Sequence, residues 1–264
     1  MKTILCPTDL SAASETALRW ATAIAARTGT GITALHALDG DGGPGAARDE
    51  VKAKLAAAAQ AIVGEVPMEV ALPAGEPQAV IVDAARQDHG LMVAGTHGPK
   101  GLRQRLFGAD MLKLVRQVSV PSLVLQAASP ADPRIRRILL PVAGHQDISA
   151  LLGMVCLLAR AFDAEVHVFQ VDRPGEEPSA QLLHNKRTML DRFAAEGIPH
   201  QDVVVPSTVF SAGFAEQTIR HAQATGMDLI AIMASASDEY RWIADAEKER
   251  LLANAARVPV LCAP

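Results

Sequence analysis

The sequence carries one pattern twice, which limits the chain to folds built from two copies of a unit. The run ILCP at Ile4–Pro7 recurs as ILLP at Ile138–Pro141, an offset of 134 residues. The Val-Pro pair at 120–121 recurs 138 residues later, at 258–259. An internal repeat of this length indicates two domains in tandem.

A linker is predicted between the two copies. The segment 127–137 (AASPADPRIRR) holds two prolines, small residues and charges. We therefore expect domains at residues 1–126 and 138–264. The 264 residues are 49% hydrophobic and 20% charged, a composition that supports two ordinary globular cores.

Short apolar runs alternate with helical periodicity in the first copy. Such alternation predicts a doubly wound α/β domain, with a parallel sheet covered on both faces and ligands at the carboxyl ends of its strands. Strands are expected at 4–6, 32–38, 68–72, 91–94 and 122–125, and helices from Ser11 or Ser14 to Gly29, at 46–63, at 77–86 and from 108 onward.

Glycines punctuate the segment that follows the apolar run Leu91–Ala94. Gly95 and Gly98 are separated by two residues, and Gly108 follows after nine more, where helical periodicity begins. Glycine lets backbone N–H groups approach a ligand closely, and a helix start offers unpaired N–H donors to an anion. The spacing therefore predicts a loop that could hold a phosphate chain.

This pattern resembles the glycine signature of the universal stress protein family, in which the third glycine is followed by Ser or Thr. Two further segments resemble the family: Pro7-Thr8-Asp9-x-Ser11 after the first strand, and His36-Ala37 at the end of the second. The resemblance covers essentially the whole chain. It implies a five-stranded parallel sheet of the adenine-nucleotide hydrolase-like type in each domain, and an adenine nucleotide such as ATP as the ligand.

The resemblance also implies a role for each matching residue. Asp9 would meet the ribose or the adenine edge, Ala37 would contact the adenine through its backbone, and the three glycines would surround the phosphates. From residue type alone, Asp9 could equally be a turn or helix-capping residue, and His97 could be an exposed loop residue without a role. The predicted nucleotide-binding set is Pro7, Thr8, Asp9, Ala37, Gly95, His97, Gly98, Gly108, Ala109 and Asp110.

The chain departs from the family signature at Ala109, where Ser or Thr is expected. A hydroxyl there would donate a charge-assisted hydrogen bond to a phosphate, worth about 1.5–3 kcal/mol. The neighbouring carboxylate of Asp110 also opposes a polyphosphate unless Lys100, Arg103 or Arg105 offsets it. Nucleotide binding is therefore expected in this half, but weakened.

The second copy lacks the residues that would form the site. At an offset of 138, Gly95, Gly98, Gly108 and Ala109 correspond to Met233, Ala236, Ala246 and Glu247. At an offset of 134, Thr8 and Asp9 correspond to Val142 and Ala143. The second domain is therefore predicted to be a degenerate, structural copy without the phosphate loop.

Composition argues against several classes of partner. The net charge of −4, the pI near 6.1 and the 3% of aromatic residues give no basis for binding nucleic acid or an anionic membrane. The N-terminus has no signal-peptide apolar run. Three cysteines without a paired spacing, Cys6, Cys156 and Cys262, are expected to be buried and reduced, which is typical of a cytoplasmic protein.

The expected function is that of a stress-response protein that binds ATP or a related adenine nucleotide in its first domain. No metal site and no catalytic motif is visible, so at most slow hydrolysis is expected, with the role of Mg²⁺ open. The alternative is an interaction scaffold that binds no nucleotide. The resemblance further implies an intrachain pseudo-dimer, with 258–261 beside 122–125, and favours pairing of two chains.

Overall fold

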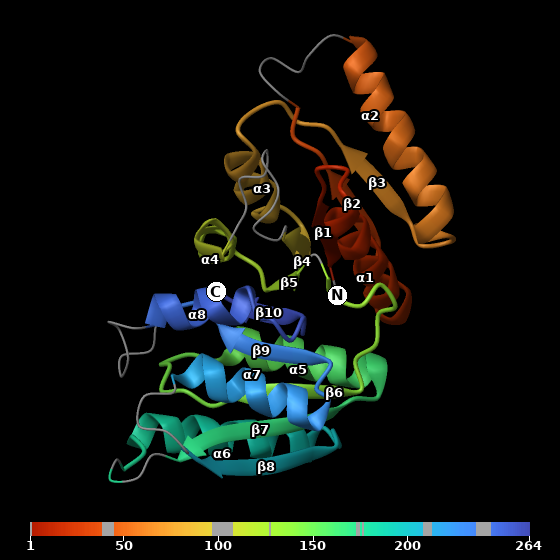
Figure 1. The fold of residues 1–264 in the computed structure, drawn as a ribbon. Coiled ribbons are helices and arrows are strands. Elements are labelled where there is room, and N and C mark those ends of the chain that lie inside the picture. Colours follow the sequence, from red (N-terminus) through yellow and green to blue (C-terminus); the bar gives the residue numbers. More distant parts are fainter. Residues whose placement is uncertain are drawn as a thin grey trace. The chain divides into compact units, whose positions relative to one another are not determined.

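The computed structural model describes residues 2–38, 45–96, 108–126, 128–172, 175, 177–207, 213–235 and 244–264. The chain divides into two compact units, Met1–Pro133 and Arg134–Pro264. Each unit is described separately below (Figure 1).

The first unit is a doubly wound α/β domain. Its described strands are ordered β3-β2-β1-β4-β5, and every neighbouring pair is parallel. Its elements are β1 (Thr3–Pro7), α1 (Ala12–Thr28), β2 (Ile32–Leu35), α2 (Gly45–Ala58) with a π-helical turn at Ala59–Val63, β3 (Met68–Ala71), α3 (Pro77–Ala85), β4 (His89–Thr96), α4 (Gly108–Gln117) and β5 (Ser122–Gln126).

The second unit repeats this strand order. Its described strands run β8-β7-β6-β9-β10, again all parallel. Its elements are β6 (Arg137–Pro141), α5 (Ser149–Phe162), β7 (Glu165–Asp172), α6 (Ala180–Ala195), β8 (His200–Pro206), α7 (Phe214–Thr225), β9 (Leu229–Met233), α8 (Ala244–Leu252) and β10 (Val260–Ala263). Two five-stranded parallel α/β units confirm the predicted fold class.

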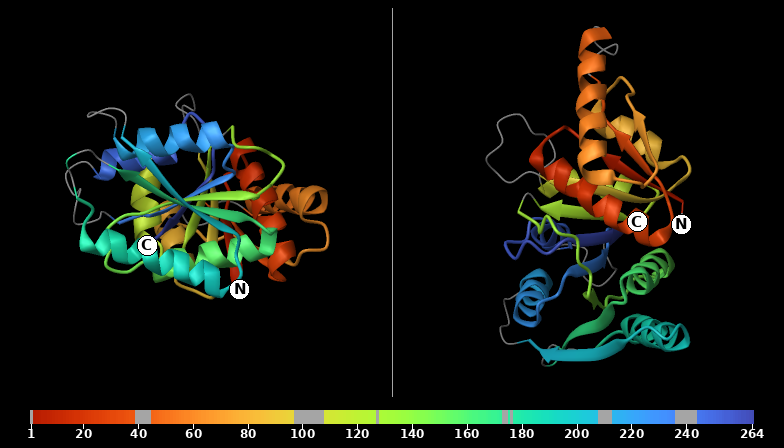
Figure 2. Two further views of the ribbon diagram at one scale, coloured as in Figure 1. Left: turned by 90° about the horizontal axis from the view of Figure 1, so that it is seen from below. Right: turned by 90° about the vertical axis from the view of Figure 1, so that its right-hand side faces the viewer.

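Helices cover both faces of each sheet. In the first unit, α1 and α2 lie on one side of the strands and α3 and α4 on the other (Figure 1). In the second unit, α5 and α6 lie opposite α7 and α8 (Figure 2, left). Strands covered on both faces are apolar along their length, and β9 (LIAIM) and β10 (VLCA) are buried throughout.

Helix α1 illustrates how the sequence determines the ends and the buried face of a helix. Its amino end is capped by Ser11, whose side chain accepts from the Ser14 N–H, and its carboxyl end by Gly29 in the left-handed conformation (φ 64°). Between these caps, Ala17, Trp20 and Ile24 recur at helical spacing and are buried against the sheet.

Several predicted boundaries differ from the structure, among them the following three. Strand β2 ends at Leu35, and Leu38 forms only an isolated bridge to Ala74. The helix expected at 46–63 is α-helical to Ala58 and then widens into the π-helical turn. Strand β4 continues through Gly95 to Thr96, because both residues pair with β5. Gly95 and Thr96, predicted as loop residues, therefore belong to the strand.

Candidate functional site at the carboxyl edge of the first sheet

The fold brings the predicted residues of three separate segments to one edge of the first sheet. Pro7 ends β1 and pairs with Leu35, which ends β2 just before Ala37. On its other side β1 pairs with β4, whose last residues include Gly95. The carboxyl ends of parallel strands form the usual ligand-binding edge of such sheets. The arrangement therefore matches a site that spans β1, β2 and β4.

The turn after β1 is held by its own side chains. The Thr8 hydroxyl oxygen accepts from the Leu10 N–H (3.0 Å), and the Asp9 carboxylate accepts from the Ser11 N–H (3.1 Å). These two bonds hold Leu10 at φ 64°, a left-handed conformation that a residue with a Cβ rarely adopts. Asp9 thus has the turn role that its sequence context allowed. A carboxylate accepts several hydrogen bonds, so this role is compatible with binding a ligand.

The β2 end is tied to the same turn. The Nδ1 atom of His36 lies 2.8 Å from the backbone oxygen of Thr8, and the Thr8 N–H donates to the Leu35 oxygen at 2.8 Å. Ala37, the next residue, is half-buried. These bonds join the end of β2, two residues before Ala37, to the turn that holds Thr8 and Asp9.

Glycine is required at position 95 by the packing of β4 against α1, independently of any ligand. A Cβ at this position would lie 2.6 Å from the carbonyl carbon of Ala13 and 3.1 Å from the Ser14 nitrogen. The first turn of α1 therefore rests directly on β4, and only glycine leaves room for it. The sequence interpretation had assigned this glycine to the phosphates alone.

Helix α4 begins at the third glycine of the signature. Gly108, Ala109 and Asp110 are its first three residues, and the N–H groups of a first helical turn have no partner within the helix. Asp110 is exposed, and its carboxylate already complements the positive helix end. His97 and Gly98 lie outside the described residues, as do Lys100, Arg103 and Arg105.

The corresponding edge of the second sheet is filled by side chains of α8. The Lys248 ammonium donates to the backbone oxygens of Met233 (2.5 Å) and Ser235 at the end of β9. Glu247 accepts from the Ala215 N–H at 2.6 Å and packs against Gly213, at the start of α7. The sequence repeat predicts the position of Glu247 but not the contacts of Lys248, which corresponds to Asp110 at the 138-residue offset.

The turn after β6 is also held differently from the turn after β1. The Asn185 side chain, from α6, donates to the backbone oxygens of Ala143 (2.7 Å) and His145 (2.8 Å). Asn185 is buried, with 2% of its surface exposed. The second turn is therefore fixed by a side chain from another helix, where the first is fixed by its own Thr8 and Asp9.

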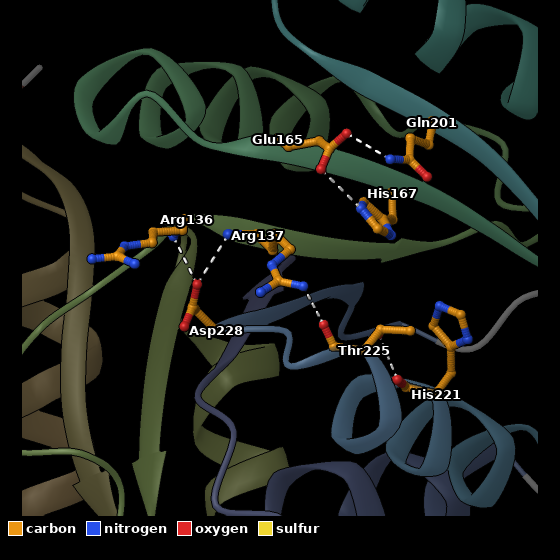
Figure 3. A network of polar contacts seen from close by, with 8 residues as sticks. All are labelled: Arg136, Arg137, Glu165, His167, Gln201, His221, Thr225 and Asp228. Atoms are coloured by element: carbon orange, nitrogen blue, oxygen red, sulfur yellow. Dashed lines mark hydrogen bonds and ion pairs between the residues drawn. The ribbon is translucent and has the colours of Figure 1, made fainter.

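A polar cluster at the opposite edge of the second sheet supports the fold (Figure 3). The Asp228 carboxylate accepts from the backbone N–H groups of Arg136 (2.8 Å) and Arg137 (3.0 Å), and the Arg137 guanidinium donates to the Thr225 oxygen (2.5 Å). These bonds join the start of β6 to the turn between α7 and β9. The cluster lies at the amino ends of the strands, away from the ligand edge.

A buried histidine, His167, and a half-buried one, His221, lie near this cluster (Figure 3). His167 contacts the Glu165 carboxylate at 3.3 Å, and Gln201 donates to Glu165 at 2.7 Å, so both lower the pKa of Glu165, with Gln201 the larger cause. His221 stacks on Phe169 with a centroid separation of 4.6 Å. Burial and the nearby His167 lower the pKa of His221, which favours its neutral form.

The cysteines are buried and free, as predicted. Burial raises the pKa of Cys6 and of Cys262 to about 12, so both are thiols at neutral pH. Among the described residues, no three His, Cys, Asp or Glu side chains lie close enough to share a metal ion. Within the same part of the chain, no helix combines the length and apolarity needed to cross a membrane.

Known proteins identify the class of this fold. A universal stress protein from Archaeoglobus fulgidus DSM 4304 superimposes with a TM-score of 0.74 at 18% identity, covering 99% of this chain and 97% of that chain. A putative universal stress protein from Pseudomonas aeruginosa UCBPP-PA14 gives a TM-score of 0.63 at 18% identity, covering 99% and 92%. The likeness extends over both units and shows that they share the fold of these two proteins.

The family model for the universal stress protein family matches residues 1–126. Residues 1–126 therefore form a universal stress protein domain. A universal stress protein solved in complex with cAMP is also similar, with 21% identity, a TM-score of 0.40, and coverage of 48% of this chain and 98% of that chain. No curated protein is similar enough to count as a match.

Proposed function

We propose that the N-terminal unit binds an adenine nucleotide, such as ATP, at the carboxyl edge of its sheet, and that the chain acts as a nucleotide-responsive stress protein. The observation that carries this proposal is the convergence of the Thr8–Asp9 turn, Ala37 and the end of β4 in the unit that the family model matches. The C-terminal unit serves as its structural partner.

The described residues fit parts of a nucleotide. The Asp9 carboxylate suits ribose hydroxyls, because it accepts hydrogen bonds from two donors. The first turn of α4 supplies backbone N–H groups for phosphate oxygens, with Ala109 contributing its N–H but no hydroxyl. The exposed Asp110 carboxylate acts against the phosphates, so we expect a weaker complex than a Ser or Thr at position 109 would give.

Binding, and not turnover, is the proposed activity. The family motif in this sequence places no general base and no set of metal carboxylates beside the phosphates. We therefore propose that any ATP hydrolysis is slow compared with nucleotide exchange. Measuring phosphate release by the nucleotide-loaded protein, with and without Mg²⁺, tests this point.

Displacement of a fluorescent ATP analogue tests the site directly. Gly98→Val should abolish binding, because the added side chain would block the phosphate loop. Ala109→Ser should tighten binding by about tenfold, because it restores a charge-assisted hydrogen bond. Asp110→Asn should also tighten it, because it removes a negative charge, whereas Asp88→Asn, an exposed change before β4, should leave binding unchanged.

A nucleotide-free interaction scaffold is the second candidate function. The observation that favours it is the pair Ala109 and Asp110 at the start of α4, where the family signature has a hydroxyl after the glycine. Binding that appears in Ala109→Ser or Asp110→Val, but is absent from the parent protein, would support the scaffold.

The same proposal includes association of the two units through their last strands, 122–125 and 258–261, in a reducing cytoplasm where the three thiols stay free. Cysteine pairs introduced along these two strands should crosslink within one chain upon oxidation. Equilibrium sedimentation would show whether two chains associate further, as the family resemblance favours.

A further inference from the structure

The first unit contains a pocket between α1 and α2 that shares Thr8 with the proposed nucleotide site but otherwise extends over different residues. It has a volume of about 220 Å³. Its lining residues come from α1 and the turn before it, from α2, and from β1 and β2. It is lined by Cys6, Thr8, Leu10, Ser11, Ser14, Glu15, Leu18, Ala34, Lys54, Leu55 and Ala58.

The pocket exists because small residues face each other across it. Ala34 on β2 and Ala58 on α2 leave a gap that Leu18 and Leu55, both buried, only partly fill. Helix α2 is alanine-rich, and of its residues Leu55 is buried while Lys52, Ala53, Ala56 and Ala57 are exposed. A helix seated on so few large side chains cannot close the space above Cys6.

The volume limits the ligand to a small molecule. A dry cavity of about 150 Å³ holds one benzene, and sites for drug-sized ligands measure roughly 300–1,000 Å³. A pocket of about 220 Å³ therefore suits a molecule with one ring or two fused rings.

One wall of the pocket presents hydrogen-bond acceptors. The Ser14 hydroxyl donates to the Ser11 oxygen (2.9 Å) and the Thr8 hydroxyl donates to Ser14 Oγ (3.0 Å), so both hydroxyl protons are engaged. The Thr8 and Ser11 hydroxyl oxygens each accept one backbone N–H, and a hydroxyl oxygen has two acceptor positions. The Glu15 carboxylate, also at this wall, is an acceptor only. A ligand that donates a hydrogen bond would use the remaining acceptor positions of this wall.

The charges around the pocket are balanced in pairs. Lys54 forms an ion pair with Glu50 at 2.7 Å, and Glu15 forms one with Arg19 at 2.8 Å. Both charged side chains of the described lining, Glu15 and Lys54, are thus paired with a neighbour, so a charged ligand would find no unpaired counter-ion there. The pocket therefore favours an uncharged ligand.

From these observations we propose that the α1–α2 pocket binds an uncharged molecule of one or two rings that carries a hydroxyl or amino donor. The apolar rings lie against Leu18, Ala34 and Ala58, and the donor faces the hydroxyl oxygens of Thr8 and Ser11. This ligand site differs from the proposed nucleotide site but shares the turn after β1 with it.

The probe that tests this proposal is 2-naphthol, with 2-methoxynaphthalene as the analogue that has the same rings but no donor. Both are titrated into the full-length protein and followed by ligand-observed NMR and by naphthol fluorescence. We expect one 2-naphthol per chain, and binding of the methyl ether that is weaker by about tenfold or more. Absence of 2-naphthol binding to the parent protein, or equal affinity for both probes, would overturn the proposal. This test requires no variant.

A matched pair of variants locates the probe. Ala58→Leu fills the pocket from α2 and should abolish 2-naphthol binding, whereas Ala57→Leu adds the same side chain on the exposed face and should preserve it. Gly98→Val should bind 2-naphthol like the parent protein, whether or not ATP binds. Retained binding in Ala58→Leu, or loss in Gly98→Val, would place the probe elsewhere and contradict the assignment.

Discussion

The two carboxyl edges of this molecule share a strand order but not their chemistry. In the first unit, the edge is lined by small residues and by polar side chains that bond within their own turn, such as Thr8 and Asp9. In the second unit, Lys248 covers the backbone oxygens at the end of β9, and Glu247 binds the amino end of α7. The same strand order therefore places a ligand-binding edge in both units. The side chains that follow the strands determine whether the backbone groups at that edge are available to a ligand.

The two units also cap corresponding helices by different means. Helix α3 is capped by Glu76, whose carboxylate accepts from the Ala79 N–H at 2.8 Å. The N-cap of α7 is Gly213, which has no capping side chain, and Glu247 on α8 accepts from the Ala215 N–H instead. Loss of a local cap thus coincides with recruitment of a carboxylate to the position that corresponds to Ala109.

Among substitutions at positions where the two units differ, Gly95→Ala should produce the largest loss of stability. The new Cβ would overlap the Ala13 carbonyl, so we expect the free energy of unfolding to fall by about 1–3 kcal/mol. The control Gly153→Ala, within α5 and with nothing near its Cβ position, should instead gain about 0.5–1 kcal/mol. Urea unfolding followed by circular dichroism measures both. An unchanged stability of Gly95→Ala would refute the close contact.

Glu247→Ala should destabilise the protein by about 1 kcal/mol, because it removes the carboxylate that binds the start of α7. Glu76→Ala provides the matched change in the first unit and should cost a similar amount. The same unfolding assay compares them. If only Glu76→Ala has an effect, Glu247 does not replace the missing cap of α7.

Leu10→Gly should stabilise the first unit by about 1 kcal/mol, because Leu10 occupies a left-handed conformation at φ 64°. Gly144 stands at the corresponding position of the second unit, at the 134-residue offset. The reverse change, Gly29→Leu at φ 64°, should lose a comparable amount. A destabilised Leu10→Gly would show that contacts of the leucine outweigh the strain of its backbone.

The smallest expected effect is a pH dependence confined to the second unit. Burial and His167 lower the pKa of His221, so below the ordinary value of 6.5 the unfolded chain binds a proton that the folded chain does not. Stability should therefore fall as the pH drops below 6.5, and stay level above it as far as this group is concerned. His221→Phe should flatten that fall in thermal melts between pH 7 and 5. A parallel fall in this variant would assign the effect to other groups.

The sequence predicted the fold well because its signals were local. Apolar runs of strand length, the caps Ser11 and Gly29, and the internal repeat each follow from short-range chemistry. Boundaries were less accurate where pairing decides them: β4 continues through Gly95 because β5 is long enough to pair with it. That extension depends on pairing with the neighbouring strand, so the residues of β4 alone do not predict it.

The candidate site was predictable only in part. The positions of Asp9, Ala37 and Gly95 at one edge follow from strand order, which the sequence pattern implies. The contacts of Lys248, Asn185 and Glu247 join elements that are distant in the sequence, so no local pattern reveals them. The packing role of Gly95 against Ala13 was missed for the same reason.

Calorimetric titration of the nucleotide-stripped protein with ATP, with and without Mg²⁺, tests the difference between the two edges most directly. The account predicts one binding site per chain, which is lost in Gly98→Val and retained in Glu247→Ala. Two sites per chain, no detectable site, or one site that survives Gly98→Val would contradict it.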